Sequence, residues 1–192
     1  LFLEQPFVNA TLVNGSLRKV CSLPRFVDSN EWLAVNTFDF FMHTNFFYDA
    51  VAEFCDEAGE CAVMNGGPSF EYTWTDSQRR TVKLSAPQYV DSAMSWIQTV
   101  LYDEQIFPTK GTNPFPKDLQ NTLRAIYKHL FRIFAHIYHC HYDKILHMSA
   151  EGHLNTLFAH VICFGREFDL LDKKELSPMS EFITELEKSG RI

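Results

Sequence analysis

The chain has 192 residues, of which 46% are hydrophobic and 15% aromatic, and its formal net charge at pH 7 is −7. This length predicts a single domain, residues 1–192, with a substantial core. The negative charge disfavours nucleic acid as the main partner. No run of about eighteen uncharged apolar residues occurs, so we expect no membrane insertion. The opening residues lack the basic start of a signal peptide, and because the first residue is not Met we expect further residues upstream.

The first elements are an arm and a long helix. Residues 1–27 show turn formers and no sustained hydrophobic period, which predicts an extended N-terminal arm. The sequence Asp28-Ser29-Asn30-Glu31 is typical of a helix start, because a polar cap precedes an acid in the first turn. The helix is expected from about Glu31 to Phe54. Its core face is predicted to hold Leu33, Phe40, Phe47 and Val51.

A second face of this helix mixes acids with large apolar side chains. Its members are Glu31, Val35, Asp39, Met42, Phe46, Asp49 and Glu53. The sequence leaves two explanations open: the apolar groups pack under a neighbouring element, or they form a protein-binding surface rimmed by carboxylates.

The remaining elements predict a mainly α fold, a helical bundle with one small β-hairpin. In chain order they are a loop (55–67), a hairpin (70–75 and 81–84), an amphipathic helix (89–102), a Pro-rich loop (107–116), a helical stretch broken near residue 141 (117–149), and two last helices (151–168 and 178–188).

Cysteines and histidines suggest a metal site, with zinc as the expected ion. Cys55 and Cys61 flank a loop, and the segment 136–141 holds three histidines and a cysteine. Structural zinc sites often pair two Cys with two His. On one continuous helix, His136 would share a face with His139 or Cys140. Residue 141 lies about 140° from residue 136 on an ideal helix, so using both requires the helix to bend or end between them.

Other interpretations of these residues remain open. The histidines could be core polar groups, and the cysteines small buried hydrophobes. A rival iron or manganese site at His147, Glu151 and His153 lacks the paired Glu-x-x-His spacing that such bundles use. No hydrolase, phosphate-loop or kinase motif occurs. We therefore predict a protein that is not an enzyme, with a metal-dependent enzyme as the weaker alternative.

Charge is unevenly distributed along the chain. No Lys or Arg occurs between Phe26 and Gln78, a stretch that contains ten acids. Such a block is usually a solvated face, but it also favours a basic partner. The helical stretch after residue 117 carries a cationic ridge, whose members are Lys117, Arg124, Lys128 and Arg132. A guanidinium in such a ridge suits a phosphorylated side chain.

Several short motifs are distributed along the whole chain: Asn30-Glu-Trp-Leu-Ala-Val-Asn-Thr37, Phe54-Cys55 with Cys61, Tyr72-Thr-Trp74, Ser85-Ala-Pro-Gln-Tyr-Val90, Phe107-Pro-Thr-Lys110 and Arg132-Ile-Phe-Ala-His-Ile-Tyr-His139. With these motifs the chain resembles the Mob family of kinase co-activators over essentially its whole length. The sequence is most similar to the second Mob subclass, whose partners are NDR-type rather than LATS-type kinases. The resemblance implies a four-helix core, a small β-hairpin and one structural Zn²⁺.

Site residues follow from the resemblance at matching positions. It implies zinc ligands at Cys55, Cys61, His136 and His141. It also implies a surface for the basic N-terminal extension of an NDR- or LATS-type AGC kinase. The matching positions for that surface are Glu31, Trp32, Val35 and Asp39. The expected function is a non-catalytic adaptor that promotes the active state of this kinase in polarity, morphogenesis or cell-cycle signalling of the Hippo-like type.

A second surface is implied by a phosphopeptide pocket of the first Mob subclass, which binds upstream Ste20-like kinases. The matching positions are Lys128, His129 and Arg132. Histidine is mostly neutral at pH 7, so phosphate affinity is expected to be weak or absent here. A scaffold for such a phosphorylated kinase is the alternative function. The expected location is the cytoplasm, with the nucleus and sites of polarised growth as further locations.

Overall fold

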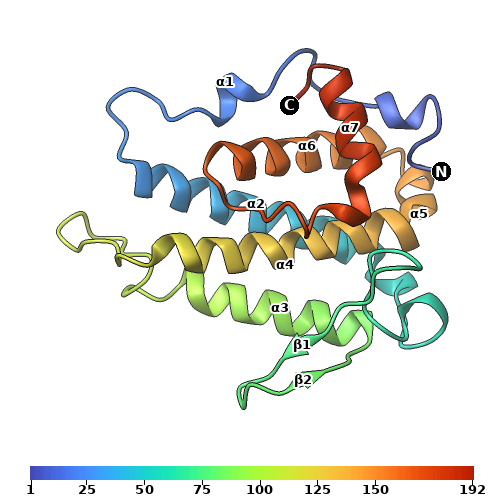
Figure 1. Cartoon of the computed structure of the whole chain (residues 1–192), viewed down its shortest axis with the longest axis horizontal. Helices are drawn as coiled ribbons and strands as arrows, with labels where there is room; N and C mark the ends of the chain where they lie inside the picture. Colours follow the sequence, from blue (N-terminus) through green and yellow to red (C-terminus); the bar gives the residue numbers. More distant parts are fainter.

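The computed structural model describes residues 1–192 and is mainly helical. Figure 1 shows α4 (Leu119–Cys140) crossing the middle of the molecule, among α2 (Ser29–Val51), α3 (Ala86–Leu101) and α6 (Glu151–Glu167). The segment Ile133 to Tyr138 of α4 is buried on every side, so α4 is the central helix of the core. This confirms the predicted helical bundle. None of the helices combines the length and the hydropathy needed to cross a bilayer.

Helix α2 begins where the sequence predicts. The Asp28 side chain accepts hydrogen bonds from the backbone N–H groups of Asn30 and Glu31, which would otherwise lack partners at a helix start. The helix ends at Val51, earlier than expected, and a 3-10 turn, η2 (Ala52–Phe54), follows it. The four predicted core residues of α2 are all buried: Leu33, Phe40, Phe47 and Val51.

The mixed face of α2 lies in solvent. Val35 is 53% exposed, Met42 51% and Phe46 68%, and Glu31 and Asp39 are exposed as well. Of the two explanations that the sequence leaves open, packing beneath another element is therefore excluded for these side chains.

The hairpin is shorter than expected. Strands β1 (Trp74–Thr75) and β2 (Thr81–Val82) pair antiparallel, with Trp74 opposite Val82. The isolated bridge between Asn65 and Glu71 adds one more contact to this region. Helix α3 begins at Ala86, earlier than predicted, because Ser85 caps it and a proline suits its first turn.

The predicted interruption near residue 141 is present. Helix α4 ends at Cys140, His141 takes non-helical torsions (φ −133°, ψ 11°), and α5 (Tyr142–His147) begins directly after it. The chain continues through α6 and the 3-10 turn η4 (Ser177–Met179) to α7 (Ser180–Lys188).

The N-terminal arm is not wholly extended, which corrects the prediction. It contains the 3-10 turn η1 (Phe7–Asn9) and a short helix, α1 (Arg18–Cys21). The arm lies along α6, where the Asn155 amide donates to the carbonyl oxygens of Phe7 and Ala10. Apolar anchors of the arm are buried in the core and fold its backbone locally: Phe2, Val8, Leu17 and Cys21.

The cap of α2 yields a stability prediction. Asp28→Ala should lower the free energy of unfolding by about 1 kcal/mol, because two backbone N–H groups lose their acceptor. Asp118→Ala is the matched control, since Asp118 precedes α4 without a side-chain capping bond. Urea unfolding measures both variants. If both variants lose the same free energy of unfolding, the two hydrogen bonds of the Asp28 cap do not stabilise the fold.

Candidate metal centre and binding surfaces

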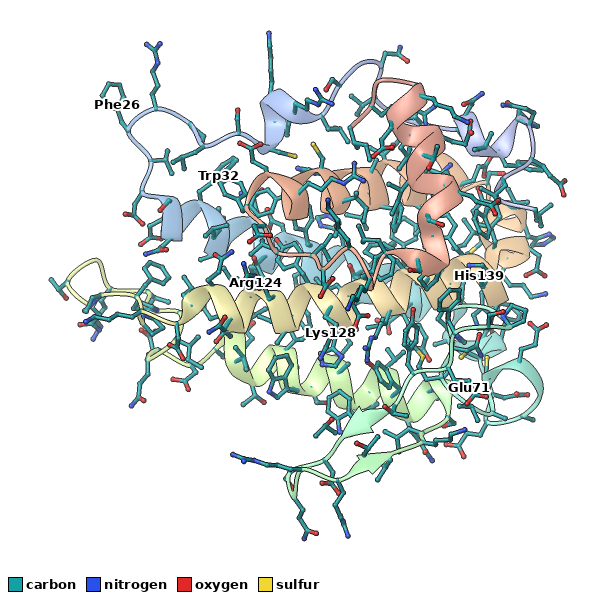
Figure 2. All side chains as sticks on the ribbon, viewed as in Figure 1. Phe26, Trp32, Glu71, Arg124, Lys128 and His139 are labelled. Carbon is teal, nitrogen blue, oxygen red and sulfur yellow. The ribbon has the colours of Figure 1, made fainter.

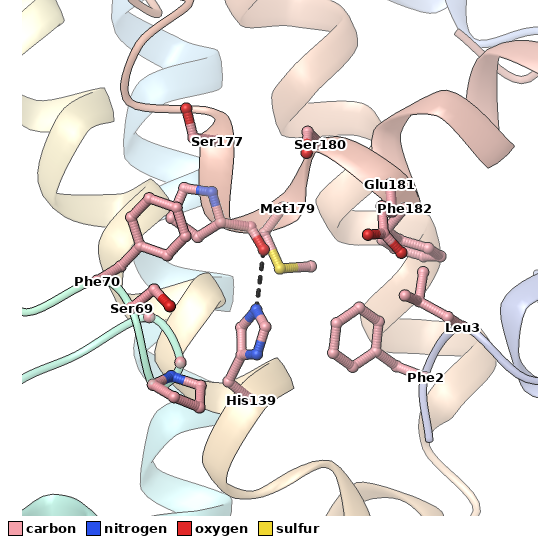
Figure 3. A pocket seen from close by; sticks show the side chains of 14 residues that line it. Phe2, Leu3, Ser69, Phe70, His139, Ser177, Met179, Ser180, Glu181 and Phe182 are labelled. Atoms are coloured by element: carbon pink, nitrogen blue, oxygen red, sulfur yellow. Dashed lines mark hydrogen bonds between the residues drawn. The ribbon is translucent and has the colours of Figure 1, made fainter.

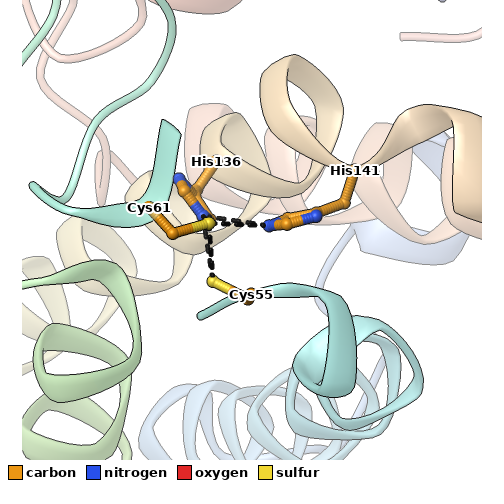
Figure 4. Close-up of side chains that lie close together, drawn as sticks. All are labelled: Cys55, Cys61, His136 and His141. Carbon is orange, nitrogen blue, oxygen red and sulfur yellow. Dashed lines mark hydrogen bonds between the residues drawn. The ribbon is translucent and has the colours of Figure 1, made fainter. Parts of the chain in front are cut away.

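Four side chains from distant parts of the sequence meet at one buried point. The ligand atoms of Cys55, Cys61, His136 and His141 all lie within 4.8 Å of one another (Figure 4). The two sulfur atoms are 3.1 Å apart, and the two Nε2 atoms are 3.3 Å apart. Cys61 Sγ lies 3.6 Å from His136 Nε2 and 3.3 Å from His141 Nε2.

These separations fit a tetrahedral metal site. For bonds of about 2.3 Å to sulfur and 2.0 Å to nitrogen, a tetrahedron places its donor atoms about 3.3–3.8 Å apart. His136 Nε2 lies 3.3–3.6 Å from the other three donor atoms, and Cys61 Sγ lies 3.3 Å from His141 Nε2, in or close to this range. The sulfur pair is closer, at 3.1 Å. A donor set of two thiols and two imidazoles in this arrangement can hold one metal ion.

The surroundings of His136 prepare it as a ligand. Its Nδ1 lies 2.9 Å from the backbone oxygen of Asn65. When Nδ1–H donates to this oxygen, the lone pair of Nε2 is free for a metal. Burial lowers the pKa of His136 to about 4, so the ring is neutral at pH 7. Burial also lowers the pKa of His141 and raises the pKa of the Cys61 thiol.

Local structure brings the two halves of the cluster together. Cys55 directly follows η2, and Cys61 ends the 3-10 turn η3 (Gly59–Cys61), which starts at a glycine with φ +55°. On the other side, the end of α4 at Cys140 turns His141 back towards His136. The break in the helix therefore allows two histidines five residues apart to share one site.

The alternative ligands point elsewhere. His139 Nε2 lies 2.8 Å from the backbone oxygen of Pro178 and lines a cavity of about 260 Å³ beside Phe2 and Phe70 (Figure 3). Cys140 Sγ contacts the Asn65 side-chain oxygen at 3.4 Å. The rival iron or manganese set is not assembled, because the cluster of Cys55, Cys61, His136 and His141 is the one group of three or more ligand-type side chains in the chain.

The predicted kinase-binding positions lie together at the start of α2. Glu31, Val35 and Asp39 are exposed on successive turns. Trp32 is half-buried, and its indole Nε1–H donates to the Cys21 carbonyl at 3.1 Å. Trp32 therefore fixes the end of the arm to α2, and the part of its side chain that is not buried is open to solvent, next to Glu31 in the chain.

Both arginines of α4 are paired with acids of the same chain. Both nitrogen atoms of one edge of the Arg132 guanidinium bind the Glu175 carboxylate, at 2.9 and 3.2 Å, and the side chain is only 15% exposed. Arg124 pairs with Asp169 in the same connection between α6 and α7. Burial lowers the pKa of Lys128, and the neighbouring Arg132 adds to this effect. Sequence analysis missed Glu175 and Asp169, since nothing in their spacing links them to α4.

His129 is packed among aromatic rings. Its ring lies near those of Trp74, Trp96 and Tyr89, and its Nδ1 is 2.8 Å from the Tyr89 hydroxyl. Arg132 donates to the same hydroxyl at 3.1 Å, so the hydroxyl proton is available for Nδ1 of a neutral His129. Burial, with Lys128 and Arg132 nearby, lowers the pKa of His129 to about 3.

The geometry describes a helical scaffold with a closed, buried Cys₂His₂ cluster and an exposed acidic and apolar helix face. Comparison with known proteins gives the family: the model of the Mob1/phocein family matches residues 9–179. The chain belongs to this family.

The chain also aligns with several known proteins over two thirds or more of their own length. The chain is 48% identical over 192 residues to "Maintenance of ploidy protein mob2" of Schizosaccharomyces pombe, covering 100% of this chain and 78% of the relative. It is 44% identical over 192 residues to "CBK1 kinase activator protein MOB2" of Saccharomyces cerevisiae, covering 100% of this chain and 67% of the relative. It is 49% identical over 185 residues to "MOB kinase activator-like 1 homolog A" of Dictyostelium discoideum, covering 95% of this chain and 86% of the relative.

These names bear on two predictions. Two of the three relatives are Mob2 proteins, in agreement with the second Mob subclass. The relatives are named as kinase activators or as a ploidy-maintenance protein rather than as enzymes, which agrees with the prediction of a non-enzyme.

Metal removal should destabilise the protein strongly. Without a cation the cluster leaves four polar groups buried and the loop after α2 untied from α4. Incubation with a strong chelator is expected to lower Tm by about 10 °C or more, since each kcal/mol shifts Tm by about 2–4 °C in a domain of this size. Differential scanning calorimetry measures the change.

Two variants control the chelation experiment. His136→Ala removes one donor and should abolish most of the chelator's effect. His153→Ala removes an exposed histidine of α6 and should leave the effect unchanged. A chelator that leaves the Tm of the unmodified protein constant would contradict a metal tie.

The neutral state of His129 predicts acid sensitivity. Its folded pKa of about 3 lies below its unfolded value, so the unfolded chain binds the proton first as pH falls. The stability that neutral His129 contributes is present above about pH 6.5 and is lost towards pH 3. In His129→Gln the fall in unfolding free energy between pH 7 and pH 5 should be smaller, by about 1–2 kcal/mol. Urea unfolding at several pH values checks this, with exposed His153→Gln as the control.

Proposed function

We propose that this protein is a non-catalytic adaptor that binds the basic N-terminal regulatory segment of an NDR-type kinase, of the NDR/LATS group of AGC kinases, and promotes its active state. The observation that carries the proposal is the exposed acidic and apolar face of α2. The names of relatives in the same family, among them the CBK1 kinase activator of Saccharomyces cerevisiae, support the kinase as partner.

The α2 face has the chemistry that a basic amphipathic helix needs. Val35, Phe38, Met42 and Phe46 are exposed at helical spacing along it. Acids flank them, and no Lys or Arg occurs between Phe26 and Gln78 to neutralise these acids. The carboxylates would accelerate the encounter with a cationic segment, and the apolar side chains would hold it after docking. Apolar anchors that recur every three or four residues are typical of recognition by amphipathic helices.

Activation would follow from order imposed on the partner. A basic segment that is mobile alone would become helical on α2, which shifts the kinase population towards the arrangement in which that segment is docked. The energy for this shift comes from the difference in affinity between the ordered and disordered segment. No catalytic group of the adaptor is needed.

We propose Zn²⁺ as the resident ion, with a structural role. Two thiols and two imidazoles in a tetrahedron are typical of structural zinc. The four residues that would hold it are Cys55, Cys61, His136 and His141, and four protein donors leave no open position for water. Elemental analysis of purified protein that finds another metal, or none, would overturn this assignment.

The phosphopeptide scaffold for a Ste20-like kinase has less support. Arg132 has the fork geometry that suits phosphate, but the carboxylate of Glu175 already binds it. His129 is neutral and buried among rings, so it adds no charge. The location that we propose is the cytoplasm, with the nucleus and sites of polarised growth as further locations, and the proposed context is signalling for polarity, morphogenesis or the cell cycle.

Charge reversal on α2 tests the proposal. Glu31→Lys and Asp39→Lys should each weaken binding of a recombinant N-terminal segment of an NDR-type kinase about tenfold, with a lower salt dependence, because an attractive charge becomes repulsive. Both side chains are exposed, so Tm should change little. Isothermal titration calorimetry at two salt concentrations measures the affinity.

The matched control is Asp91→Lys, which reverses an exposed acid on α3. It should leave the affinity within a factor of two or so of the unmodified protein. If Glu31→Lys and Asp39→Lys bind as well as this control, the α2 face is not the docking surface.

A further inference from the structure

One aromatic side chain is presented to solvent in an unfavourable backbone conformation. Phe26 lies in the turn between α1 and α2, where the Val27 N–H donates to the Pro24 carbonyl at 3.4 Å. As third residue of this turn it takes φ +67°, a left-handed conformation that favours glycine. It is the one apolar residue of the chain with a positive φ, since the other non-glycine cases are Arg79, Ser149 and Asp169.

The Phe26 ring also does not pack against the core. The residue is fully exposed to solvent. Figure 2 shows it at the outer end of the loop, pointing away from the body of the molecule. Both the torsion and the exposure of the ring oppose the stability of the isolated fold, and such a local cost is typical of functional positions.

The turn that carries Phe26 is held at both ends. On one side Cys21 is buried and its carbonyl accepts the Trp32 indole N–H. On the other side the Asp28 side chain caps α2. Only a few residues lie between these fixed points, so the ring is presented in advance on a restrained loop, which reduces the entropy lost on binding.

The loop adds apolar surface beside the acidic start of α2. Its other exposed apolar side chains are Leu23 and Val27, and Val20 in α1 is exposed as well. Arg25 is exposed next to Phe26 in the chain, but the charged side chains exposed at the start of α2 are acidic: Glu31 lies in the first turn and Asp39 two turns further on, with the apolar Val35 between them. An occupant that satisfies both features is amphipathic and basic: it carries an apolar socket for the ring and cations for the carboxylates.

We propose that Phe26 is an aromatic anchor that inserts into an apolar socket on the basic kinase segment when this segment docks on α2. The inference rests on the proposed function and extends the docking surface from α2 onto the α1–α2 loop. A single aromatic side chain at such a position often dominates the binding energy of an interface. Phe26 thereby selects partners that offer a matching socket next to their cationic residues.

Replacement by glycine separates binding from folding. Phe26→Gly removes the ring and suits the left-handed torsion, so Tm should stay constant or rise. Affinity for the recombinant N-terminal segment of an NDR-type kinase should fall roughly tenfold or more in Kd. Phe26→Tyr, which keeps the ring, should retain most of the affinity. Calorimetric titration and thermal unfolding provide the two readouts.

Arg79→Gly is the matched backbone control. Arg79 also has a positive φ, +61°, but lies in the β1–β2 turn, on the other side of α4 in Figure 1. It should reproduce any rise in Tm without a change in affinity. Phe26→Gly with unchanged affinity overturns the anchor, as does a fall in Tm that the control does not show.

The charge-reversal variants distinguish the two proposals. If Glu31→Lys weakens binding and Phe26→Gly does not, the α2 surface stands and the anchor is wrong. If neither variant weakens binding, the proposed function itself is wrong.

Discussion

The cluster of Cys55, Cys61, His136 and His141 ties the segment after α2 to the end of α4, and the positions of both helices depend on this tie. Burial of two thiols and two imidazoles without a cation would leave them poorly compensated in an apolar environment. A bound ion removes that penalty and closes a loop of the chain that spans the hairpin and α3. Cys55 lies shortly after the carboxyl end of α2 and Asp28 caps its other end, so α2 is fixed at both ends.

Much of this arrangement could be predicted from the sequence. The hydrophobic period placed the buried residues of α2 correctly, since Leu33, Phe40 and Phe47 recur at helical spacing. The metal ligands were only partly predictable, because helical geometry alone favoured His139 or Cys140 beside His136. The family resemblance selected His141, and the end of α4 at Cys140 explains how His141 reaches the site. Neither glycine nor proline marks this break, so no local signal could have located it with certainty.

Other features depend on contacts between distant segments and were not predictable. No sequence pattern near Arg132 predicts its ion pair with Glu175, because the two residues come together only after α6 returns the chain to α4. The two short helical elements of the arm, η1 and α1, each contain a residue that is buried in the core, Val8 in η1 and Cys21 in α1. The full exposure of Phe26 was hidden for the same reason, since sequence shows which side chains are apolar but not which of them remain uncovered.

The pairing of Arg132 with Glu175 gives the cationic side of α4 a built-in competitor. A tethered carboxylate acts at a high effective concentration, so a singly charged ligand gains little by replacing it. A phosphate group carries nearly two negative charges at neutral pH and can offer more acceptor oxygens than the carboxylate. Any anion that is to bind Arg132 would first have to displace Glu175, which a dianion could do more readily than the carboxylates that are abundant on every protein surface.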